Sequence, residues 1–513
     1  MSRVSCRRIR LKATRESATE VGVRKLAVGL FAMMTLCSAA LAQKHEAPPT
    51  TVPVVMLSDI HFDPFADPKK VDALRKAPAS EWDAILRSPD TAQKDIDFAA
   101  LQQTCRAKGV DPAMPLVVSS LKAAQATMPN PLFVTVSGDL MAHQFDCKFK
   151  TLEKDASEAE YSAFAAKTIA FLAWELHHTF PKSPVYISLG NNDSGCKDYR
   201  EDEDSDYLKA DAKSFAAVAM DAKNAAAIEN TFPMLGDYSV TLPTPMAKTR
   251  LLVVQNIFES KSFSNCAGDK DEASAAKQVA WLRAQLAEAR AKHEHVWVMG
   301  HIPPGVNVFA ASSMGQKVCT TGNVADEFLS NEDLLDALTD YADTISLAIF
   351  AHTHMDEIRL LRGKGGVVAM KMVPSITTVG GNMSSFSVAQ VDPVRAVMTD
   401  YAVYSADNKT GIDATWTKEY DFKTAYKAKD FSAASVDALT AGFLADPKAD
   451  SDASKAYAKY YQTGTGQQAG LLGTNLGFRA IGLVAMWHEY ACAASDGHAV
   501  AYRSCVCSAS ATK

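Results

Sequence analysis

Seven side chains that commonly bind metal ions stand at the ends of short apolar runs. Five runs end in this way, at residues 52–59, 132–139, 185–192, 295–301 and 345–354. The seven side chains are Asp59, His61, Asp139, Asn191, His301, His352 and His354. A single aspartate or histidine at such a place usually has a structural role. Because the carboxyl ends of strands in an α/β sheet meet in one crevice, five such ends predict one shared metal site.

The chemistry of these ligands narrows the choice of metal. Four imidazoles, two carboxylates and one amide oxygen, with no thiolate, suit divalent Zn, Mn or Fe. Seven ligands exceed what one catalytic ion with an open position takes, so we predict two divalent metal ions. Asp139 is predicted to bridge the two ions, because its carboxylate has two oxygens and it stands in the middle of the set of ligands. Two ions about 3.5 to 4 Å apart can hold a bridging hydroxide that attacks phosphorus in line.

The elements that must position these residues follow an alternating pattern. A sixth apolar run lies at residues 251–256, and continuous apolarity over five or six residues suits strands that are covered on both faces. Helical patterns separate the runs, for example at residues 156–180 and 274–294. Strands that alternate with helices predict the α/β class.

The pattern changes after about residue 365. The runs VVAMKMV, FSVAQVD and AVMTDYAVYS follow one another without helices, which predicts an antiparallel part of the sheet system. Residues 417–463 and 467–507 have helical spacing, and the second stretch carries the last three cysteines. We therefore predict a main domain at residues 52–408 and a C-terminal helical subdomain with disulfides at residues 409–513.

The first 42 residues predict a secretory signal peptide. Basic residues precede the apolar stretch LAVGLFAMMTLCSAALA, which ends in an A-x-A motif. A membrane anchor is the alternative interpretation, but a span needs about 20 apolar residues. Residues 43–51 are a predicted linker, and nothing beyond residue 42 is long and apolar enough to cross a bilayer. We therefore expect an exported protein, periplasmic or secreted.

The mature chain would be acidic and rich in cysteine. Loss of residues 1–42, with eight basic and two acidic side chains, changes the formal net charge from −6 to −12. This charge disfavours generic binding to nucleic acid or anionic membranes. The eight remaining cysteines indicate disulfides, but 105 pairings are possible. The acidic run at residues 201–206 is either a calcium site or, as we favour, a solvated loop.

The ordered motifs resemble those of the calcineurin-like metallophosphoesterases, which run D-x-H, G-D, G-N-H, H and G-H-x-H. The matching residues here are Asp59-Ile60-His61, Gly138-Asp139, Gly190-Asn191-Asn192, His301 and Ala351-His352-Thr353-His354. Segments such as GDLMAH, WVMGHIPPG, HTHMDEIRL and WTKEYDF are similar to the acid sphingomyelinase and endopolyphosphatase branch. The resemblance spans roughly residues 52–507 and implies a β-sandwich flanked by helices.

The resemblance also implies how the two ions share their ligands. The first ion would be held by Asp59, His61, Asp139 and His354. The second would be held by Asp139, Asn191, His301 and His352.

Three further positions matter for catalysis. By the resemblance, His143 is the expected general acid, and the alternative is a partner that only orients Asp139 or a substrate oxygen. Asn192 stands where the family usually has histidine near the phosphate, and an amide donates a hydrogen bond but cannot deliver a proton. Ala351 replaces a usual glycine, and we expect metal binding to survive that change.

The resemblance has implications beyond the metal site. It implies that Cys266 pairs with Cys319 and that Cys492 pairs with Cys505. It also implies a hydrolase of phosphoester or phosphoanhydride bonds, whose substrate is a phosphate-containing small molecule, a lipid headgroup or polyphosphate. The alternative is a non-catalytic metal-binding or surface-binding protein that keeps the fold. The residues at positions 192 and 351 are its support.

Overall fold

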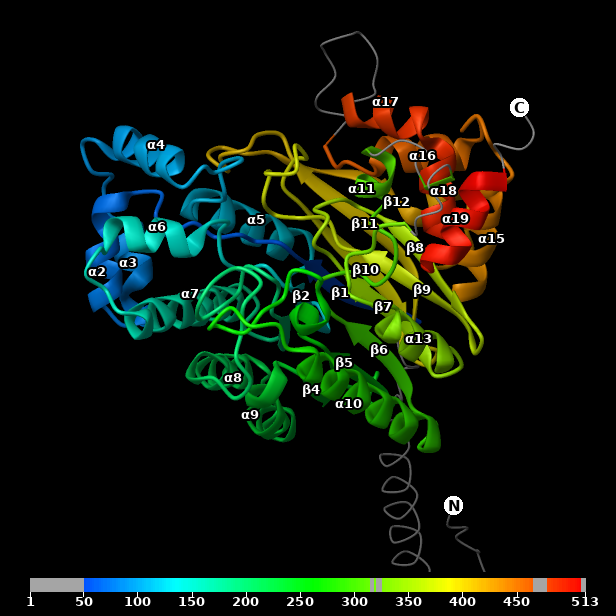
Figure 1. The fold of residues 1–513 in the computed structure, drawn as a ribbon, viewed down its shortest axis with the longest axis horizontal. Coiled ribbons are helices and arrows are strands. Elements are labelled where there is room, and N and C mark those ends of the chain that lie inside the picture. The colour runs from blue at the N-terminus through cyan, green and yellow to red at the C-terminus, as the bar shows by residue number, and fades with distance from the viewer. Residues whose placement is uncertain (1–49, 314–317, 320–324, 465–477, 509–513) are drawn as a thin grey trace, which may run out of the picture. The chain divides into compact units, whose positions relative to one another are not determined.

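The computed structural model describes residues 50–313, 318–319, 325–464 and 478–508 (Figure 1). The predicted signal peptide and nearly all of the predicted linker lie outside the described residues. Within the described ranges, every helix is too short or too polar to span a bilayer.

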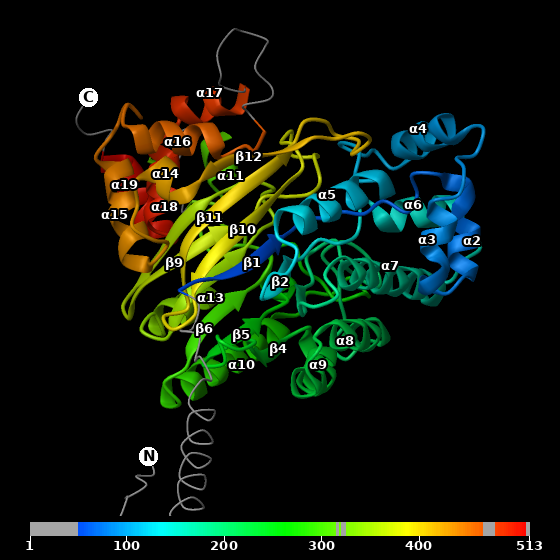
Figure 2. The ribbon, with the colours of Figure 1, turned by 180° about the vertical axis from the view of Figure 1, so that it is seen from behind.

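Two six-stranded sheets form the centre of the described structure (Figures 1 and 2). The first has the order β12-β11-β10-β1-β2-β3. Its strands are β1 (Val52–Leu57), β2 (Phe133–Ser137), β3 (Val185–Ser188), β10 (Ser385–Asp392), β11 (Val397–Ala406) and β12 (Trp416–Asp421). The second has the order β4-β5-β6-β7-β9-β8. Its strands are β4 (Tyr238–Thr241), β5 (Thr249–Val253), β6 (His295–Met299), β7 (Ile345–Phe350), β8 (Ile358–Gly363) and β9 (Gly366–Met372).

The pairing of the strands follows the sequence pattern. All six predicted runs are strands, and β1, β2 and β3 pair in parallel, as do β5, β6 and β7. In the first sheet, β10 pairs antiparallel with both β1 and β11, which confirms the antiparallel prediction there. In the second sheet, β9 pairs in parallel with β7 and antiparallel with β8.

The two sheets face each other across a shared apolar core. Phe133 of β2 and Trp297 of β6 meet with ring centroids 5.7 Å apart, and the Trp297 indole donates a hydrogen bond to the carbonyl of Ala396. Side chains alternate along each strand, so Leu251 points into this core whereas Leu252 belongs to a second cluster on the outer face. The predicted α/β sandwich is thus confirmed.

Helices cover the outer faces of the sheets (Figures 1 and 2). The helices before β8 are η1 (Pro68–Lys70), α2 (Val71–Lys76), η2 (Ala79–Glu81), α3 (Trp82–Leu86), α4 (Lys94–Thr104), α5 (Met114–Thr127), α6 (Phe145–Leu152), α7 (Glu158–Thr179), α8 (Asp206–Val218), α9 (Ala222–Leu235), η3 (Asn256–Glu259), α10 (Glu272–Ala291), α11 (Val308–Ser313) and α13 (Asp333–Asp340). The predicted helices at 156–180 and 274–294 are α7 and α10. The face of α10 that carries Leu282 and Leu286 packs on the second sheet.

The C-terminal part is helical, as expected, but it begins later than the sequence suggested. Its helices are α14 (Phe422–Tyr426), α15 (Ala433–Leu444), α16 (Asp452–Tyr460), α17 (Phe478–Ala485), α18 (Trp487–Ser495) and α19 (Ala499–Ser508). Residues 416–421, which we expected to open the helices, instead form the edge strand β12 beside β11. Threonine and aromatic residues in that segment suit a strand, and sheet pairing decides the outcome.

Four disulfides join the eight cysteines in the described part of the chain. The predicted bond between Cys492 and Cys505 is confirmed. The predicted pair of Cys266 with Cys319 is wrong, because the two residues lie beside different elements. The loop of Cys266 is hydrogen-bonded to the loop after β3, and Cys266 pairs there with Cys196. Cys319 pairs with Cys507 of α19, and the fourth bond joins Cys105 to Cys147.

The acidic run after β3 exposes Asp202, Asp204 and Asp206, as a solvated loop does, but it is also held by specific contacts. Glu201 is buried, and Asp202 accepts a hydrogen bond from the backbone N–H of Cys266. Glu203 forms an ion pair with Lys277, and Ser205 caps α8. The run therefore anchors the chain between β3 and α10.

Candidate metal centre

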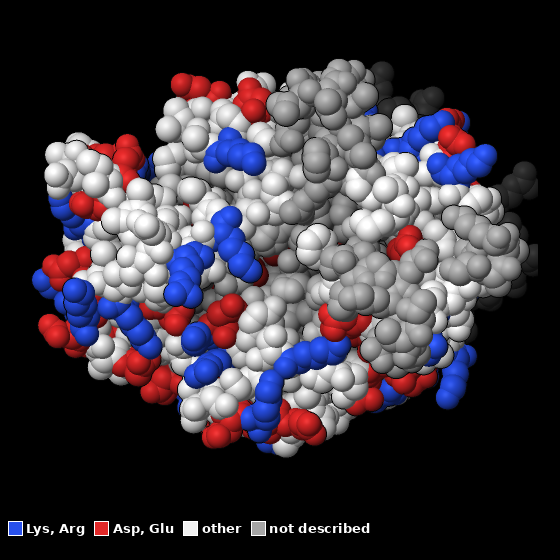
Figure 3. Space-filling view, turned by 45° about the horizontal axis from the view of Figure 1, so that its top comes forward, with Lys and Arg blue, Asp and Glu red and all other residues white. Residues whose placement is uncertain are grey.

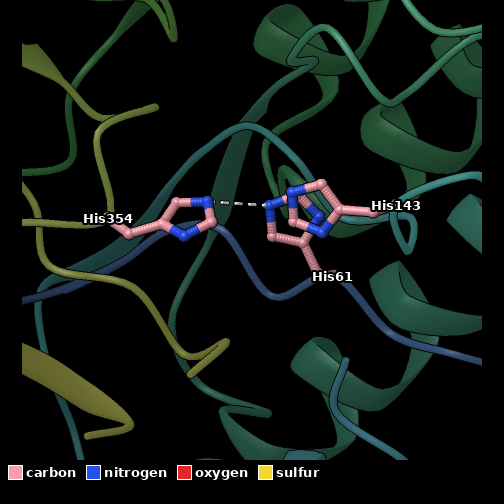
Figure 4. A group of neighbouring side chains, drawn as sticks. All are labelled: His61, His143 and His354. Carbon is pink, nitrogen blue, oxygen red and sulfur yellow. Dashed lines mark hydrogen bonds between the residues drawn. The ribbon is translucent and has the colours of Figure 1, made fainter. Parts of the chain in front are cut away.

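The seven predicted ligands gather between the ends of the two sheets. Asp59, His61, Asp139 and Asn191 follow strands of the first sheet, and His301, His352 and His354 follow strands of the second. All are buried except His352, which is half-buried. The Nε2 atoms of His61 and His354, which come from different sheets, lie 3.2 Å apart (Figure 4).

The backbone of this site is unusual. Five of the seven residues have a positive φ, with values of 46° at Asp59, 46° at His61, 53° at Asp139, 72° at His352 and 65° at His354. Non-glycine residues rarely adopt this left-handed conformation, and it costs of the order of 1 kcal/mol each. Such a concentration of strained positions at one place indicates a functional site.

Asp139 lies at the centre of the group. Its Oδ1 accepts a hydrogen bond from the backbone N–H of Asn192, and its Oδ2 accepts one from the Asn192 side-chain amide, both at 2.9 Å. The same Oδ2 lies 3.1 Å from His301 Nε2 and 3.4 Å from His61 Nε2. One carboxylate oxygen therefore faces imidazoles from both sheets.

Two glycines allow this crowding. A Cβ at Gly190 would lie 2.2 Å from Asp139 Oδ1, and one at Gly138 would lie 2.6 Å from His301 Nδ1. Gly138 also has a φ of 94°. Ala351 differs from these glycines. Its φ is negative, which suits an alanine, and its methyl group is fully buried. The site therefore accepts the alanine at position 351.

Hydrogen bonds orient the ligand atoms toward the centre. His61 Nδ1 contacts the carbonyl oxygen of Met141 at 2.9 Å, and His301 Nδ1 contacts that of Ser137 at 2.8 Å. A carbonyl only accepts, so Nδ1 carries the proton in both rings, and in the neutral form of each ring Nε2 keeps a lone pair for a metal. Asn191 Nδ2 donates to Asp198 Oδ1 at 2.9 Å, which turns the amide oxygen of Asn191 toward the site.

Several buried polar atoms at the site lack a hydrogen-bond partner among the described residues. They include both carboxylate oxygens of Asp59, the amide oxygen of Asn191, Nε2 of His301 and Nδ1 of His352. A buried polar atom without a partner is costly, and metal coordination is one way to satisfy it. Two groups of donors have their ligand atoms within 4.8 Å of one another, namely Asp59 with His61 and Asp139, and Asp139 with His301 and His352. The residues present therefore fit divalent metal ions.

The electrostatics of the site agree with this fit. Burial raises the pKa of Asp59 to about 7 and lowers the pKa of His61 to about 4 and that of His352 to about 3. Burial also acts to lower the pKa of His301, but the charge of Asp139 outweighs it and raises that pKa to about 9. Burial thus disfavours an ionised Asp59, and a bound cation would favour the ionised form.

His143 faces the same space from the loop before α6. Its ring stacks on His61 with centroids 4.0 Å apart (Figure 4). Its Nδ1 contacts Asp111 Oδ1 at 2.9 Å, and its backbone N–H donates to Asp111 Oδ2 at 2.8 Å. Burial lowers the pKa of His143, but the hydrogen bond to Asp111 and the charge of Asp111 outweigh it, so the net shift is upward. Nε2 of His143 therefore lies on the side of the ring that faces away from Asp111.

The sequence did not identify the residues that support the ligands. Asp111 lies in a loop with no motif around it. Asp193 follows the two asparagines, and its buried carboxylate accepts hydrogen bonds from the backbone N–H groups of Leu140, Met141 and Gly190 at 2.8 to 2.9 Å. It ties the loop after β2 to the loop after β3. Its place directly after Gly190-Asn191-Asn192 was a signal that could have identified it.

A polar pocket of about 260 Å³ opens over these residues. Asp139, His143, Asn191, Asn192, His352 and His354 all line it. Asn192 thus reaches the pocket while its amide holds Asp139, and its contact with substrate stays a prediction. Lys108 at the rim is exposed and brings a cation to the pocket.

The chain belongs to the calcineurin-like phosphoesterase family. The family model matches residues 52–356, which include all the ligand positions predicted above. The protein is therefore a metallophosphoesterase, a hydrolase that acts on phosphoester bonds.

Its relatives belong to the acid sphingomyelinase-like group. "Acid sphingomyelinase-like phosphodiesterase 3b" of Mus musculus is 23% identical over 405 residues, which cover 76% of this chain and 79% of that protein. "Cyclic GMP-AMP phosphodiesterase SMPDL3A" of Mus musculus is 24% identical over 376 residues, which cover 67% of this chain and 78% of that protein. The predicted branch is thus confirmed.

Proposed function

We propose that this protein is an exported phosphodiesterase that works with two divalent metal ions. The observation that carries the proposal is the pair of donor groups that share Asp139. One group draws on Asp59 and His61, the other on His301 and His352. Export is supported by the four disulfides, because such bonds persist in oxidising compartments.

The ligand sets assigned by resemblance agree with this geometry. Asp59, His61, Asp139 and His354 would hold one ion, and Asp139, Asn191, His301 and His352 the other. When bound, such ions activate water and neutralise the charge of phosphate oxygens. Asp139 belongs to both sets. Asn192 holds its carboxylate, and Asp193 holds its loop in place.

His143 would move the proton that the leaving group needs. Asp111 holds Nδ1, so the proton to be donated sits on Nε2, which borders the polar pocket. The upward shift of the His143 pKa keeps the imidazolium populated nearer to neutral pH. His143 also lies within ligand reach of His61 and His354, so a role as a metal ligand is the competing assignment.

The surface agrees with a small or lipid-like substrate rather than nucleic acid. On the face drawn in Figure 3, Lys and Arg side chains are interspersed with Asp and Glu. Binding to a nucleic-acid backbone relies on a gathered basic surface. The relatives named as phosphodiesterases favour a phosphodiester over polyphosphate, and both belong in the assay.

The test uses the purified mature protein with Mn²⁺ or Zn²⁺ and bis(p-nitrophenyl) phosphate. We expect metal-dependent hydrolysis, with about two ions per chain by elemental analysis. Asp139→Asn should lower metal content and abolish turnover. The control Asp340→Asn removes an exposed carboxylate that pairs with Arg283 and should change neither. Full metal content without hydrolysis of this substrate, sphingomyelin, nucleotides or polyphosphate would support the non-catalytic alternative instead.

A further inference from the structure

A second cavity adjoins the polar pocket of the metal centre. Its volume is about 680 Å³, within the range that holds a drug-sized ligand. His352 and His354 line both spaces, as do Lys108 and Val379 at the rim. A phosphoester held at the metal centre could therefore extend one of its substituents into this cavity without leaving the ligands.

The walls of the second cavity are mainly apolar and aromatic. They are formed by residues of α11, the loop before α13, the loop after β7 and the C-terminal helices, including Val308, Phe328, Met355, Leu483, Met486 and Tyr490. Most of these side chains are buried or half-buried. The cavity is therefore suited to an apolar or flat organic group and not to a second phosphate.

One carboxylate oxygen gives this cavity a polar feature. Glu357 lines the cavity and is only 1% exposed. Its Oε2 accepts hydrogen bonds from the Arg359 guanidinium at 2.7 and 2.9 Å, and Arg359 also donates to the carbonyl of Val306 at 3.0 Å. Glu357 Oε1 has no hydrogen-bond partner in the described part of the chain.

An unsatisfied oxygen in a mainly apolar cavity selects for a donor. A buried acceptor left without a partner is unfavourable, so a ligand that supplies an N–H or O–H gains relative to one that cannot. The charge of Arg359 already balances the carboxylate of Glu357, so this ion pair favours a neutral hydrogen-bond donor over a cation.

We propose that this cavity binds an apolar or aromatic substituent of the substrate that carries an N–H or O–H group, and that Glu357 Oε1 accepts the hydrogen bond from it. The inference rests on the proposed phosphodiesterase function and adds the chemistry of the group next to the phosphate. A nucleobase has this chemistry, and so does the amide and hydroxyl region of a sphingolipid.

Paired substrates test the requirement for a donor and separate the two sources. The nucleotide pair is p-nitrophenyl thymidine 5′-phosphate and its N3-methyl derivative, which lacks the imide N–H. The lipid pair is sphingomyelin and phosphatidylcholine, which has neither amide N–H nor hydroxyl. We expect kcat/KM to be at least about tenfold higher for the donor-bearing member of one pair. Glu357→Gln should reduce that preference, because the carboxylate is lost while the shape is kept.

A second variant tests the cavity without touching the buried ion pair. Gly482 of α17 lines the cavity, and a Cβ there would meet no described atom within 4 Å. Gly482→Trp should fill the space and raise KM for the donor-bearing member of the preferred pair at least about fivefold. Gly442 of α15 has equally open surroundings and lies outside this cavity, so Gly442→Trp is the matched control.

The outcomes separate this inference from the proposed function. If the wild-type protein hydrolyses bis(p-nitrophenyl) phosphate but shows no donor preference in either pair, the inference is wrong and the function stands. The same holds if Gly482→Trp and Gly442→Trp have equal effects. If no phosphodiester is hydrolysed by the metal-loaded protein, the proposed function itself has failed.

Discussion

Replacing Asp111 by asparagine tests how His143 is held for proton transfer. Asp111 Oδ1 lies 2.9 Å from His143 Nδ1, and the carboxylate is almost wholly buried. A hydrogen bond to a charged group contributes about 1.5 to 3 kcal/mol. If that stabilises the charged imidazole in the transition state, its loss corresponds to roughly a 10- to 150-fold lower rate. Asparagine keeps the shape, so the ring should stay in place while its pKa falls.

The assay compares leaving groups of similar shape. Methyl phenyl phosphate needs its leaving oxygen protonated far more than methyl p-nitrophenyl phosphate does. We expect Asp111→Asn to lower kcat for the phenyl ester by the full factor and for the nitrophenyl ester only slightly. Thr377→Val is the control, because Thr377 Oγ1 donates to the same Asp111 oxygen at 3.1 Å but carries no charge. An equal loss on both esters, with unchanged metal content, would refute an acid role for His143.

Three other perturbations have definite expected results. Burial raises the pKa of Glu201 to about 8, so the folded protein keeps a proton that the unfolded chain loses above its ordinary value of 4.5. The free energy of unfolding should therefore fall as pH rises from about 5 to 8, by at most about 1.4 kcal/mol per pH unit from this group, and urea unfolding of Glu201→Gln should show a flatter profile. Lys108→Ala should raise KM roughly two- to fivefold at low salt and less in about 0.5 M NaCl, because salt screens the attraction between Lys108 and an anionic substrate. A change in kcat alone would argue against a role of Lys108 in anion binding. Replacing both Cys105 and Cys147 by alanine opens a link across 42 residues and should cost about 4 kcal/mol in thermal or urea unfolding, and an unchanged midpoint would show that this bond does not constrain the unfolded chain.

The strand ends were predictable because chemistry and topology coincide there. A parallel strand is a continuous apolar run, and the first polar residue after it must lie at the sheet edge. Asp59, Asp139 and His301 satisfy both conditions, so their convergence followed from the pattern alone. The conformational reason for the glycines did not follow from the pattern. Only the packed structure shows that Gly190 leaves room for Asp139 and that Ala351 is acceptable.

Other features depend on contacts between distant parts of the chain, which periodicity cannot reveal. Asp111 reaches His143 across 32 residues, and nothing in its neighbours marks it. The pairing of Cys319 with Cys507 spans 188 residues and depends on where α19 docks. The residues of β12 were assigned to the helical part because helical spacing follows them in the sequence. Their pairing with β11 at the edge of the sheet outweighs that local pattern.

The division of the ligands between the two sheets has a consequence for assembly. Each proposed ion would take donors from loops of both sheets, so it would link the two sheets of the sandwich to each other. A chain in which either half is misplaced would lack a complete coordination shell, and metal uptake would then report correct docking as well as readiness for chemistry. By linkage, chelation should loosen the junction between the sheets, and added ion should protect it in proportion to its affinity for the folded form.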